Sequence, residues 1–259
     1  MAFLKDRILI HFNTNYIRVY EFTNKILQTK YEMNRMITVE ELKSGIFTQI
    51  DEFFRDLKGY TNTINNEYVR LYATGVYQTL DSKSTVQLIN HIFIYYGLYF
   101  NIVQPDLEKF YLERSMKISG SRSLVEGIIS QEFRNVVVCG SFKHSIKEIE
   151  DTIKILKNQN ITVLSPTTTK LRPETLGSNF VLFEGQELMN ERDAWRHQYW
   201  HISQFSTSDA VIICVPNGKV GKGALFELGY LVAISKRIIF TEKPQNLSVI
   251  FPYEVGLNF

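Results

Sequence analysis

The chain has 259 residues, a hydrophobic share of 44%, a charged share of 22% and a formal net charge of +2. This composition is typical of a folded globular protein and excludes a disordered or fibrous chain. The small net charge, without a cluster of Lys and Arg, excludes a surface for nucleic acid, and no apolar run approaches the roughly 20 residues of a membrane span.

The N-terminal half is predicted to be an α/β domain. Two β-rich runs, Arg7–Phe12 and Tyr16–Phe22, are separated by the turn-prone residues 13–15, which predicts a hairpin. The spacing of apolar residues then predicts helices over 39–57, 84–96 and 107–131 and strands over 69–73 and 99–103. The last helix is broken at Ser119–Ser121, and we expect the domain boundary near Ser130. The predicted domains are therefore 1–130 and 131–259, a division that suits the length of the chain.

The C-terminal half alternates strands and helices, which predicts a Rossmann-like (flavodoxin-like) parallel sheet. Strands are expected over 136–139, 161–164, 210–215 and 237–240, and helices over 146–157, 190–205 and 225–234. Ser145 and Glu148 fit a capping box at the first of these helices. The irregular stretch 166–188 is longer than a connector requires, which indicates a lid or substrate loop. A ligand is expected at the carboxyl ends of the strands.

The start of the chain and the two cysteines indicate where the protein functions. The segment Met1–Arg7 lacks the long apolar core of a signal peptide, so we expect a cytoplasmic protein. Cys139 and Cys214 each end an apolar run and are expected to be small buried residues without a disulfide bond.

Three segments that are distant in the sequence are expected to meet at the carboxyl edge of the second sheet. They are Gly140-Ser141, the loop Asn217–Gly223 and a helix start that bears Glu227. A carboxylate in the first turn of a helix is stabilised in its ionised form by the helix dipole and by free backbone N–H groups. Glu227 is therefore a candidate nucleophile or electrostatic stabiliser, although the same residue is common at ordinary helix starts.

Motifs of one enzyme family extend over most of the C-terminal half: Cys139–Lys143, Ser208–Ile213, Phe226–Ala233 and Lys236–Ile239. They resemble the nucleoside 2-deoxyribosyltransferase superfamily, and within it the 2′-deoxynucleoside 5′-phosphate N-hydrolases. The resemblance implies a homo-oligomeric N-glycosidase or deoxyribosyltransferase that acts on the N-glycosidic bond of a nucleoside or nucleoside 5′-monophosphate. Glu227 matches the family's glutamate, which implies a nucleophile that forms a covalent glycosyl-enzyme with retention.

Further site residues follow from the same resemblance. Gly140 and Ser141 match a loop that lines the nucleotide pocket, although a plain turn after a strand has the same composition. Gly221, Lys222 and Gly223 lie where the hydrolases bind a 5′-phosphate, with Lys222 and Lys219 as sources of positive charge, although a solvated loop is equally open.

Asp209 and two histidines complete the candidate set. Asp209 is open as a pocket residue or as a cap. His201 occupies the position of the family's assisting aspartate, and it either acts as a general acid or marks a lost activity. His197 and His201 share a helical face but lack a third ligand, so no metal site is predicted. The aromatic pair Trp195 and Tyr199 is expected in the core, with a platform on which a base stacks as the alternative.

The N-terminal half more weakly resembles the first lobe of exopolyphosphatase-like members of the actin/Hsp70 ATPase fold. This resemblance implies a ribonuclease-H-like sheet. His11, Asn13 and Gln78 stand where that family has an aspartate, a glycine and an arginine, whereas Glu108 lies where its glutamate falls. Because the second lobe is missing, domain 1–130 is expected to be a degenerate single lobe with a scaffold, dimerisation or sensing role.

Cleavage or transfer at an N-glycosidic bond is the leading hypothesis for function. The alternative is a non-catalytic nucleotide-binding sensor or regulatory protein. A residual phosphohydrolase of the first half would depend on Glu108. We expect a nucleoside or nucleotide as the partner, no nucleic acid polymer, no membrane and no cofactor.

Overall fold

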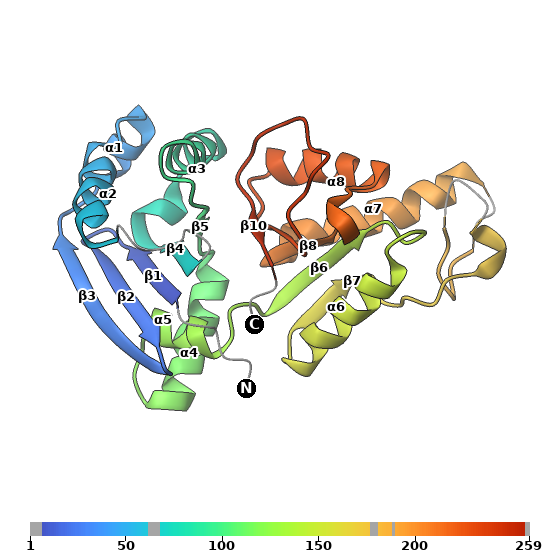
Figure 1. The fold of residues 1–259 in the computed structure, drawn as a ribbon, viewed down its shortest axis with the longest axis horizontal. Helices are drawn as coiled ribbons and strands as arrows, with labels where there is room; N and C mark the ends of the chain where they lie inside the picture. The colour runs from blue at the N-terminus through green and yellow to red at the C-terminus, as the bar shows by residue number, and fades with distance from the viewer. Residues whose placement is uncertain (1–6, 62–67, 177–180, 188–189, 257–259) are drawn as a thin grey trace. The chain divides into compact units, whose positions relative to one another are not determined.

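The structure, a computed structural model, describes residues 7–61, 68–176, 181–187 and 190–256. The chain divides into two compact units, whose described residues lie within 7–132 and 133–256 (Figure 1). The expected boundary near Ser130 lies close to this division. The N-terminal residues 1–6 and parts of the expected lid, 177–180 and 188, lie outside the described residues. Within the described ranges, no helix is long and apolar enough to cross a membrane.

The first unit contains a mixed five-stranded sheet in the order β3-β2-β1-β4-β5. Strands β1, β2 and β3 are antiparallel, whereas β4 and β5 continue from β1 in parallel. This arrangement confirms the expected α/β class with a ribonuclease-H-like sheet. The strands are β1 (Arg7–Phe12), β2 (Tyr16–Thr23), β3 (Ile26–Asn34), β4 (Val69–Ala73) and β5 (Phe100–Ile102).

Helices cover both faces of the first sheet. Apolar residues of α1, α2 and α3 pack on one face around Phe12, and residues of α4 and α5 pack on the other around Tyr72 (Figure 1). The helices are α1 (Val39–Ser44), α2 (Thr48–Thr61), α3 (Ser82–Tyr96), α4 (Pro105–Ser119) and α5 (Leu124–Ser130), with a short 3₁₀ turn η2 (Gly75–Thr79) after β4.

Two features of the first unit differ from the prediction. Strand β3 was not expected, because most of its side chains are polar and exposed; it is formed through a tight turn in which Asn24 and Lys25 both have positive φ. The helix expected over 39–57 is two helices. Gly45, at φ 73°, ends α1 in the left-handed conformation before α2 begins.

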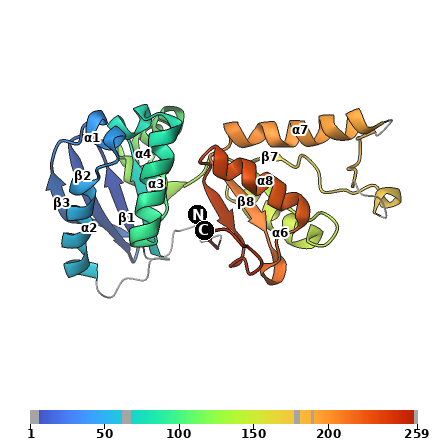
Figure 2. The same ribbon diagram turned by 90° about the horizontal axis from the view of Figure 1, so that it is seen from above.

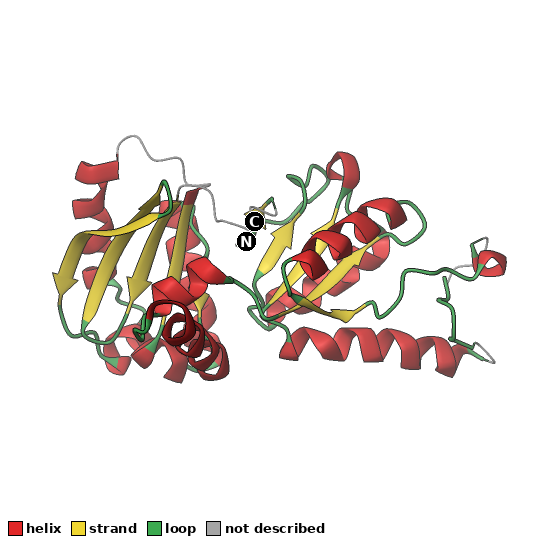
Figure 3. Ribbon diagram, turned by 90° about the horizontal axis from the view of Figure 1, so that it is seen from below, coloured by secondary structure: helices red, strands yellow, loops and turns green. Residues whose placement is uncertain are grey.

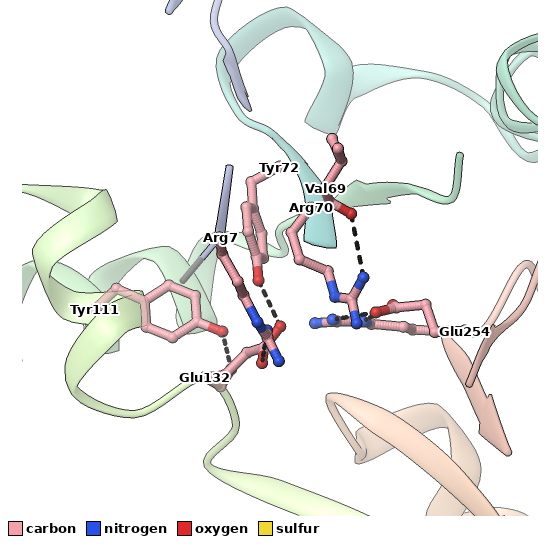
Figure 4. Close-up of polar contacts among 8 residues, drawn as sticks. Arg7, Val69, Arg70, Tyr72, Tyr111, Glu132 and Glu254 are labelled. Atoms are coloured by element: carbon pink, nitrogen blue, oxygen red, sulfur yellow. Dashed lines mark hydrogen bonds and ion pairs between the residues drawn. The ribbon is translucent and has the colours of Figure 1, made fainter. Parts of the chain in front are cut away.

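A buried carboxylate joins several elements of the first unit. The carboxylate of Glu132 accepts hydrogen bonds from the Tyr72 hydroxyl at 2.5 Å and from Arg7 Nη1 at 3.3 Å. The Tyr111 hydroxyl donates to the backbone carbonyl of the same residue. Figure 4 shows these side chains converging on Glu132. A buried charge is costly without partners, and here the partners of Glu132 come from β1, β4 and α4. The network therefore links the end of the unit to these three elements.

The second unit contains a five-stranded parallel sheet in the order β10-β9-β8-β6-β7. Numbered from β6, this is the order 2-1-3-4-5 of flavodoxin-like domains, as predicted. Only the two-residue β10 was not expected. The strands are β6 (Asn135–Gly140), β7 (Thr162–Ser165), β8 (Ala210–Cys214), β9 (Ile238–Phe240) and β10 (Glu254–Val255).

Helix α6 packs on one face of this sheet, and α7 and α8 pack on the other. These helices are α6 (Ile146–Asn158), α7 (Glu191–Thr207) and α8 (Lys222–Ala233). The first turns of α7 extend beyond the sheet, where the segment after β7 turns back towards the helix (Figure 2). The described part of that segment is mostly loop (Figure 3).

The capping box expected at α6 is not formed. The side chain of Ser145 makes no capping hydrogen bond, and the carboxylate of Glu148 instead accepts a hydrogen bond from the Thr241 hydroxyl. The competing tertiary hydrogen bond draws Glu148 away from the helix N-terminus, which the local sequence could not indicate.

Candidate functional site

A cavity of about 280 Å³ lies at the carboxyl edge of the second sheet, on the face that α7 and α8 cover. Its walls come from the loop after β6, the segment between β7 and α7, and the two helices. The residues that line it are Phe142, Ser165, Pro166, Thr167, Val181, Leu182, Phe183, Gln186, Ala194, His197, Gln198, Trp200, His201, Gly223 and Glu227. The cavity therefore lies where parallel α/β sheets commonly bind ligands.

Periodicity explains how three polar side chains meet at or beneath the floor of this cavity, which His201 and Glu227 line. Alternation along β6 directs Cys139 to the same face as Val137, towards α7 and α8. Helical spacing places Glu227 beside Ala224 and Leu228, which are buried on α8. His201 lies one turn before the buried Phe205 of α7, and the two rings contact each other.

These residues form what we call the Cys139–His201–Glu227 cluster. His201 Nε2 lies 3.4 Å from Cys139 Sγ and 3.5 Å from Glu227 Oε1. His201 Nδ1 lies 2.6 Å from the hydroxyl oxygen of Ser165, at the end of β7. One imidazole therefore connects two strands and two helices of the second unit.

Burial changes the protonation of the cluster. It raises the pKa of Glu227 to about 7, although a hydrogen bond with Cys139 acts in the opposite direction. It also lowers the pKa of His201 to about 4. Burial and then the Glu227 carboxylate raise the pKa of the Cys139 thiol well above its usual range. At neutral pH the imidazole and the thiol are uncharged, and much of Glu227 is protonated.

This environment differs from the one expected for Glu227. Helix α8 begins at Lys222, so Glu227 lies more than one turn beyond the helix start and receives none of the free N–H groups of the first turn. Desolvation outweighs the helix dipole, and the carboxyl group is not held in its ionised form. The sequence pattern could not show this, because the helix start was predicted three residues too late.

The predicted loop residues also meet at this edge. Gly140, at φ 155°, ends β6, and a Cβ atom there would lie 3.1 Å from the carbonyl oxygen of Cys214. Gly221 is the N-cap residue of α8. A Cβ atom on Gly221 would lie 3.4 Å from the Cβ atom of Ser141. Gly223 lines the cavity, whereas Lys222 is exposed at the first position of α8. Their role in binding a ligand stays a prediction.

Asp209 lies away from the cavity, in contrast to the pocket position considered for it. It precedes β8, at the amino end of the sheet, and its Oδ2 accepts hydrogen bonds from the backbone N–H groups of Arg134 and Asn135, both at 2.7 Å. Its carboxylate thus joins the starts of two neighbouring strands. A structural role accounts for these contacts.

Several residues of the cavity and of the cluster beneath it were not predicted from the sequence. Cys139 was interpreted only as a small buried residue, and Ser165 was not considered. Phe142 and Phe183 form an edge-to-face pair with centroids 4.8 Å apart. The one available signal was that Ser165 directly follows the strand expected over 161–164, at the edge of the sheet where ligands bind.

The other candidates on α7 have separate environments. His197 lines the cavity and its Nε2 lies 3.0 Å from the carbonyl oxygen of Glu187. Trp195 and Tyr199 were expected in the core but are 55% and 59% exposed. Their four-residue spacing places them on the outer face of α7, where their rings contact each other.

In the first unit, the residues at the positions of the exopolyphosphatase-like family's phosphate-binding residues form hydrogen bonds with neighbouring side chains. His11 Nε2 and Asn13 Nδ2 lie 2.8 and 3.0 Å from the Thr74 hydroxyl oxygen, and Gln78 donates to Glu108 at 2.7 Å. Burial, and then the charge of Arg18, lower the pKa of His11 to about 4. These contacts occupy the polar groups that a phosphate would require.

No family model and no curated protein matches the sequence. Solved structures do match. One match is the Aquifex aeolicus member of the Ppx/GppA family, with 15% identity and a TM-score of 0.33, covering 81% of this chain and 66% of that chain. A second is the Aquifex aeolicus PPX-GPPA enzyme, with 13% identity, a TM-score of 0.33 and coverages of 81% and 67%.

A third match is the type II variant of the Aquifex aeolicus Ppx/GppA phosphatase, with 13% identity, a TM-score of 0.34 and coverages of 81% and 67%. The chain therefore spans about two thirds of the length of the solved structures that it matches.

These comparisons correct the function expected from the C-terminal motifs. The matched structures are Ppx/GppA proteins, and the expected cleavage or transfer at an N-glycosidic bond is wrong. The motifs consist of small residues at turns after strands and of one glutamate on a helix, which parallel α/β domains with different functions share. The weaker resemblance, to exopolyphosphatase-like proteins, agrees with the matched structures.

Proposed function

We propose that the second unit is the binding and reaction site for a small molecule with a flat heteroaromatic ring, of the nucleoside or nucleotide class. The observation that supports this proposal most directly is the composition of the cavity. Aromatic walls stand over a buried polar floor, the Cys139–His201–Glu227 cluster. Small-molecule sites commonly combine apolar walls with a few convergent polar groups.

The walls suit a flat ring. Phe142 and Phe183 present an edge-to-face pair on one side, and Trp200 lines the cavity from α7. Stacking on aromatic side chains contributes about 1–3 kcal/mol per base in proteins that bind single-stranded nucleic acids. The volume of about 280 Å³ lies near the lower end for ligand pockets, which favours a compact ligand.

The charge of the lining favours the ring of the ligand over a phosphate group. None of the described lining residues is Lys or Arg. The amide of Gln198, the hydroxyl of Thr167 and the carboxyl group of Glu227 provide donors and acceptors for the edge of a heterocycle. A phosphate, where the ligand has one, is expected towards the exposed Lys222, outside the cavity.

The polar floor supports a catalytic role. Groups with strongly shifted pKa values, buried together beside a cavity, are typical of catalytic centres, and here His201 and Glu227 both have this character. We therefore expect an enzyme in which this cluster acts on the reacting part of the ligand. This role is separate from the N-glycosidic reaction corrected above.

Calorimetry with the full chain tests the binding proposal. We expect a purine or pyrimidine nucleoside to bind, and ribose 5-phosphate, which lacks the ring, not to bind. Phe183→Ala should weaken binding by at least about tenfold through the loss of ring contacts. Trp195→Ala is the matched control, because Trp195 is an exposed aromatic residue of the same unit that does not line the cavity.

Two results would contradict the proposal. One is the absence of heat for every nucleoside and nucleotide of the panel. The other is equal affinity of the wild type and Phe183→Ala, since a ring bound in this cavity must contact its aromatic wall.

A further inference from the structure

We propose that the Cys139–His201–Glu227 cluster is a zinc site with one coordination position open to the cavity. This inference rests on the proposed function, because the zinc ion would supply the reactive group of the same cavity. The three ligand atoms would be the thiolate sulfur of Cys139, Nε2 of His201 and a carboxylate oxygen of Glu227.

The separations of these atoms suit a tetrahedral ion. Cys139 Sγ and Glu227 Oε1 lie 3.4 and 3.5 Å from His201 Nε2, and the three ligand atoms lie within 4.8 Å of one another. Zinc bonds of about 2.0–2.3 Å in tetrahedral geometry separate neighbouring ligand atoms by about 3.3–3.7 Å. Both measured separations from Nε2 fall in this range. We expect a bound ion to draw the remaining pair, Cys139 Sγ and the Glu227 oxygen, into the same range.

The hydrogen bond of Ser165 orients the imidazole for metal binding. With the proton on Nδ1, His201 donates to the Ser165 hydroxyl at 2.6 Å, and the lone pair of Nε2 then faces the other two ligands. Metal-binding histidines usually have such a partner on their second nitrogen.

The cluster is held in place by the fold. Cys139 is fully buried in β6, next to the centre of the sheet, and the ring of Phe205 packs against the imidazole with centroids 5.2 Å apart. Ligands on three packed elements lose little conformational freedom when an ion binds.

The donor set identifies the class of ion. A thiolate and an imidazole with one carboxylate favour Zn²⁺ over Mg²⁺ and Ca²⁺, which prefer oxygen ligands. Three protein ligands and an open position are typical of catalytic zinc, whereas structural sites have four protein ligands. His201 and Glu227 line the cavity, so the open position faces the space where the proposed ligand binds.

Cobalt substitution tests the site in the full chain. Purified protein is stripped with a chelator under reducing conditions and titrated with Co²⁺ alone. We expect one equivalent to give the intense visible bands of tetrahedral Co²⁺ and a sulfur-to-cobalt charge-transfer band, and Zn²⁺ to displace it. Cys139→Ser should abolish the charge-transfer band and weaken Zn²⁺ binding by at least about 100-fold.

The chain offers a matched control in its second cysteine. Cys214 is also buried at the end of a strand of the same sheet, but its sulfur lies 3.6 Å from the Thr152 hydroxyl on the α6 face. Cys214→Ser should keep the charge-transfer band. Ser165→Ala should keep the spectrum but weaken Zn²⁺ binding by about 10–100-fold, as for other partners of metal-bound histidine.

Three results would overturn the proposal: no tetrahedral Co²⁺ spectrum in the wild type, a charge-transfer band retained by Cys139→Ser, or Zn²⁺ affinity unchanged in Glu227→Gln. Circular dichroism shows which variants fold, and Glu227→Gln serves as the test if Cys139→Ser does not. Failure of the proposed function is distinguishable, because metal binding is measured without a nucleoside and nucleoside binding with a chelator present.

Discussion

His201 is the residue that connects the sequence analysis to the site. His201 stands at the position of the family's assisting aspartate, which left open whether it acts as a general acid or marks a lost activity. In the structure it lies beside Glu227, and both residues line one cavity. Glu227 was selected by its motif and His201 by counting back from Ser208-Asp209, and that both are functional stays a prediction. Cys139 could not be given a role, because a cysteine in an apolar strand is most often a buried hydrophobe. Only the three-dimensional packing shows that it faces the other two.

His11 provides a test at the residue scale. Burial lowers the pKa of His11 to about 4 in the folded protein. The unfolded chain takes up this proton near pH 6.5, and the folded chain does not until about pH 4. The stabilising contribution is therefore fully present above pH 6.5 and falls by up to about 3 kcal/mol as the pH decreases to 4.

Urea unfolding of the wild type and His11→Gln between pH 7 and pH 4.5 measures this effect. Glutamine can keep the contact of Nε2 with Thr74 but does not titrate. The stability difference between the two proteins should change with pH in favour of the variant at low pH. His201 is present in both proteins, so its contribution to the pH dependence cancels in the stability difference. A difference that stays constant across this range would show that His11 titrates normally.

At the scale of elements, the pattern of apolar residues predicted the helices and most strands, and tertiary contacts decided the exceptions. Strand β3 exposes most of its side chains, so its sequence lacks the alternation of a half-buried strand. The capping box at α6 is absent because Thr241, far along the chain, binds Glu148. Both wrong predictions concern residues whose structure depends on partners elsewhere in the chain, which the neighbouring sequence does not contain.

Two helical glycines give a matched prediction about packing. A Cβ atom on Gly127 of α5 would lie 2.1 Å from the backbone carbonyl oxygen of Tyr111 on α4, whereas one on Gly229 of α8 would meet nothing within 4 Å. Gly127→Ala should destabilise the protein by about 1–3 kcal/mol or more, because α4 and α5 must separate. Gly229→Ala should be neutral or stabilise it by up to about 1 kcal/mol, as alanine favours a helix.

Thermal unfolding of the two variants measures this difference. Equal melting temperatures would show that the close approach of α5 to α4 at Gly127 is absent in solution.

At the scale of the molecule, the chain combines a ribonuclease-H-like unit and a flavodoxin-like unit. The order of strands and helices was sufficient to predict this α/β class. Function could not be predicted in the same way, because turns after strands and glutamates on helices occur in domains with many different activities. The cavity and the cluster beneath it depend on side chains from five separate segments, which only the folded chain brings together.

We infer that the functional site of this protein is the cavity above the Cys139–His201–Glu227 cluster. A crystal structure of the full chain with Zn²⁺ and a nucleoside tests it most directly. We predict an anomalous zinc peak between Cys139, His201 and Glu227, and the nucleoside ring against Phe183 in the same cavity. A ring bound instead beside Thr74 and Glu108 of the first unit, with no zinc at the cluster, would contradict the account.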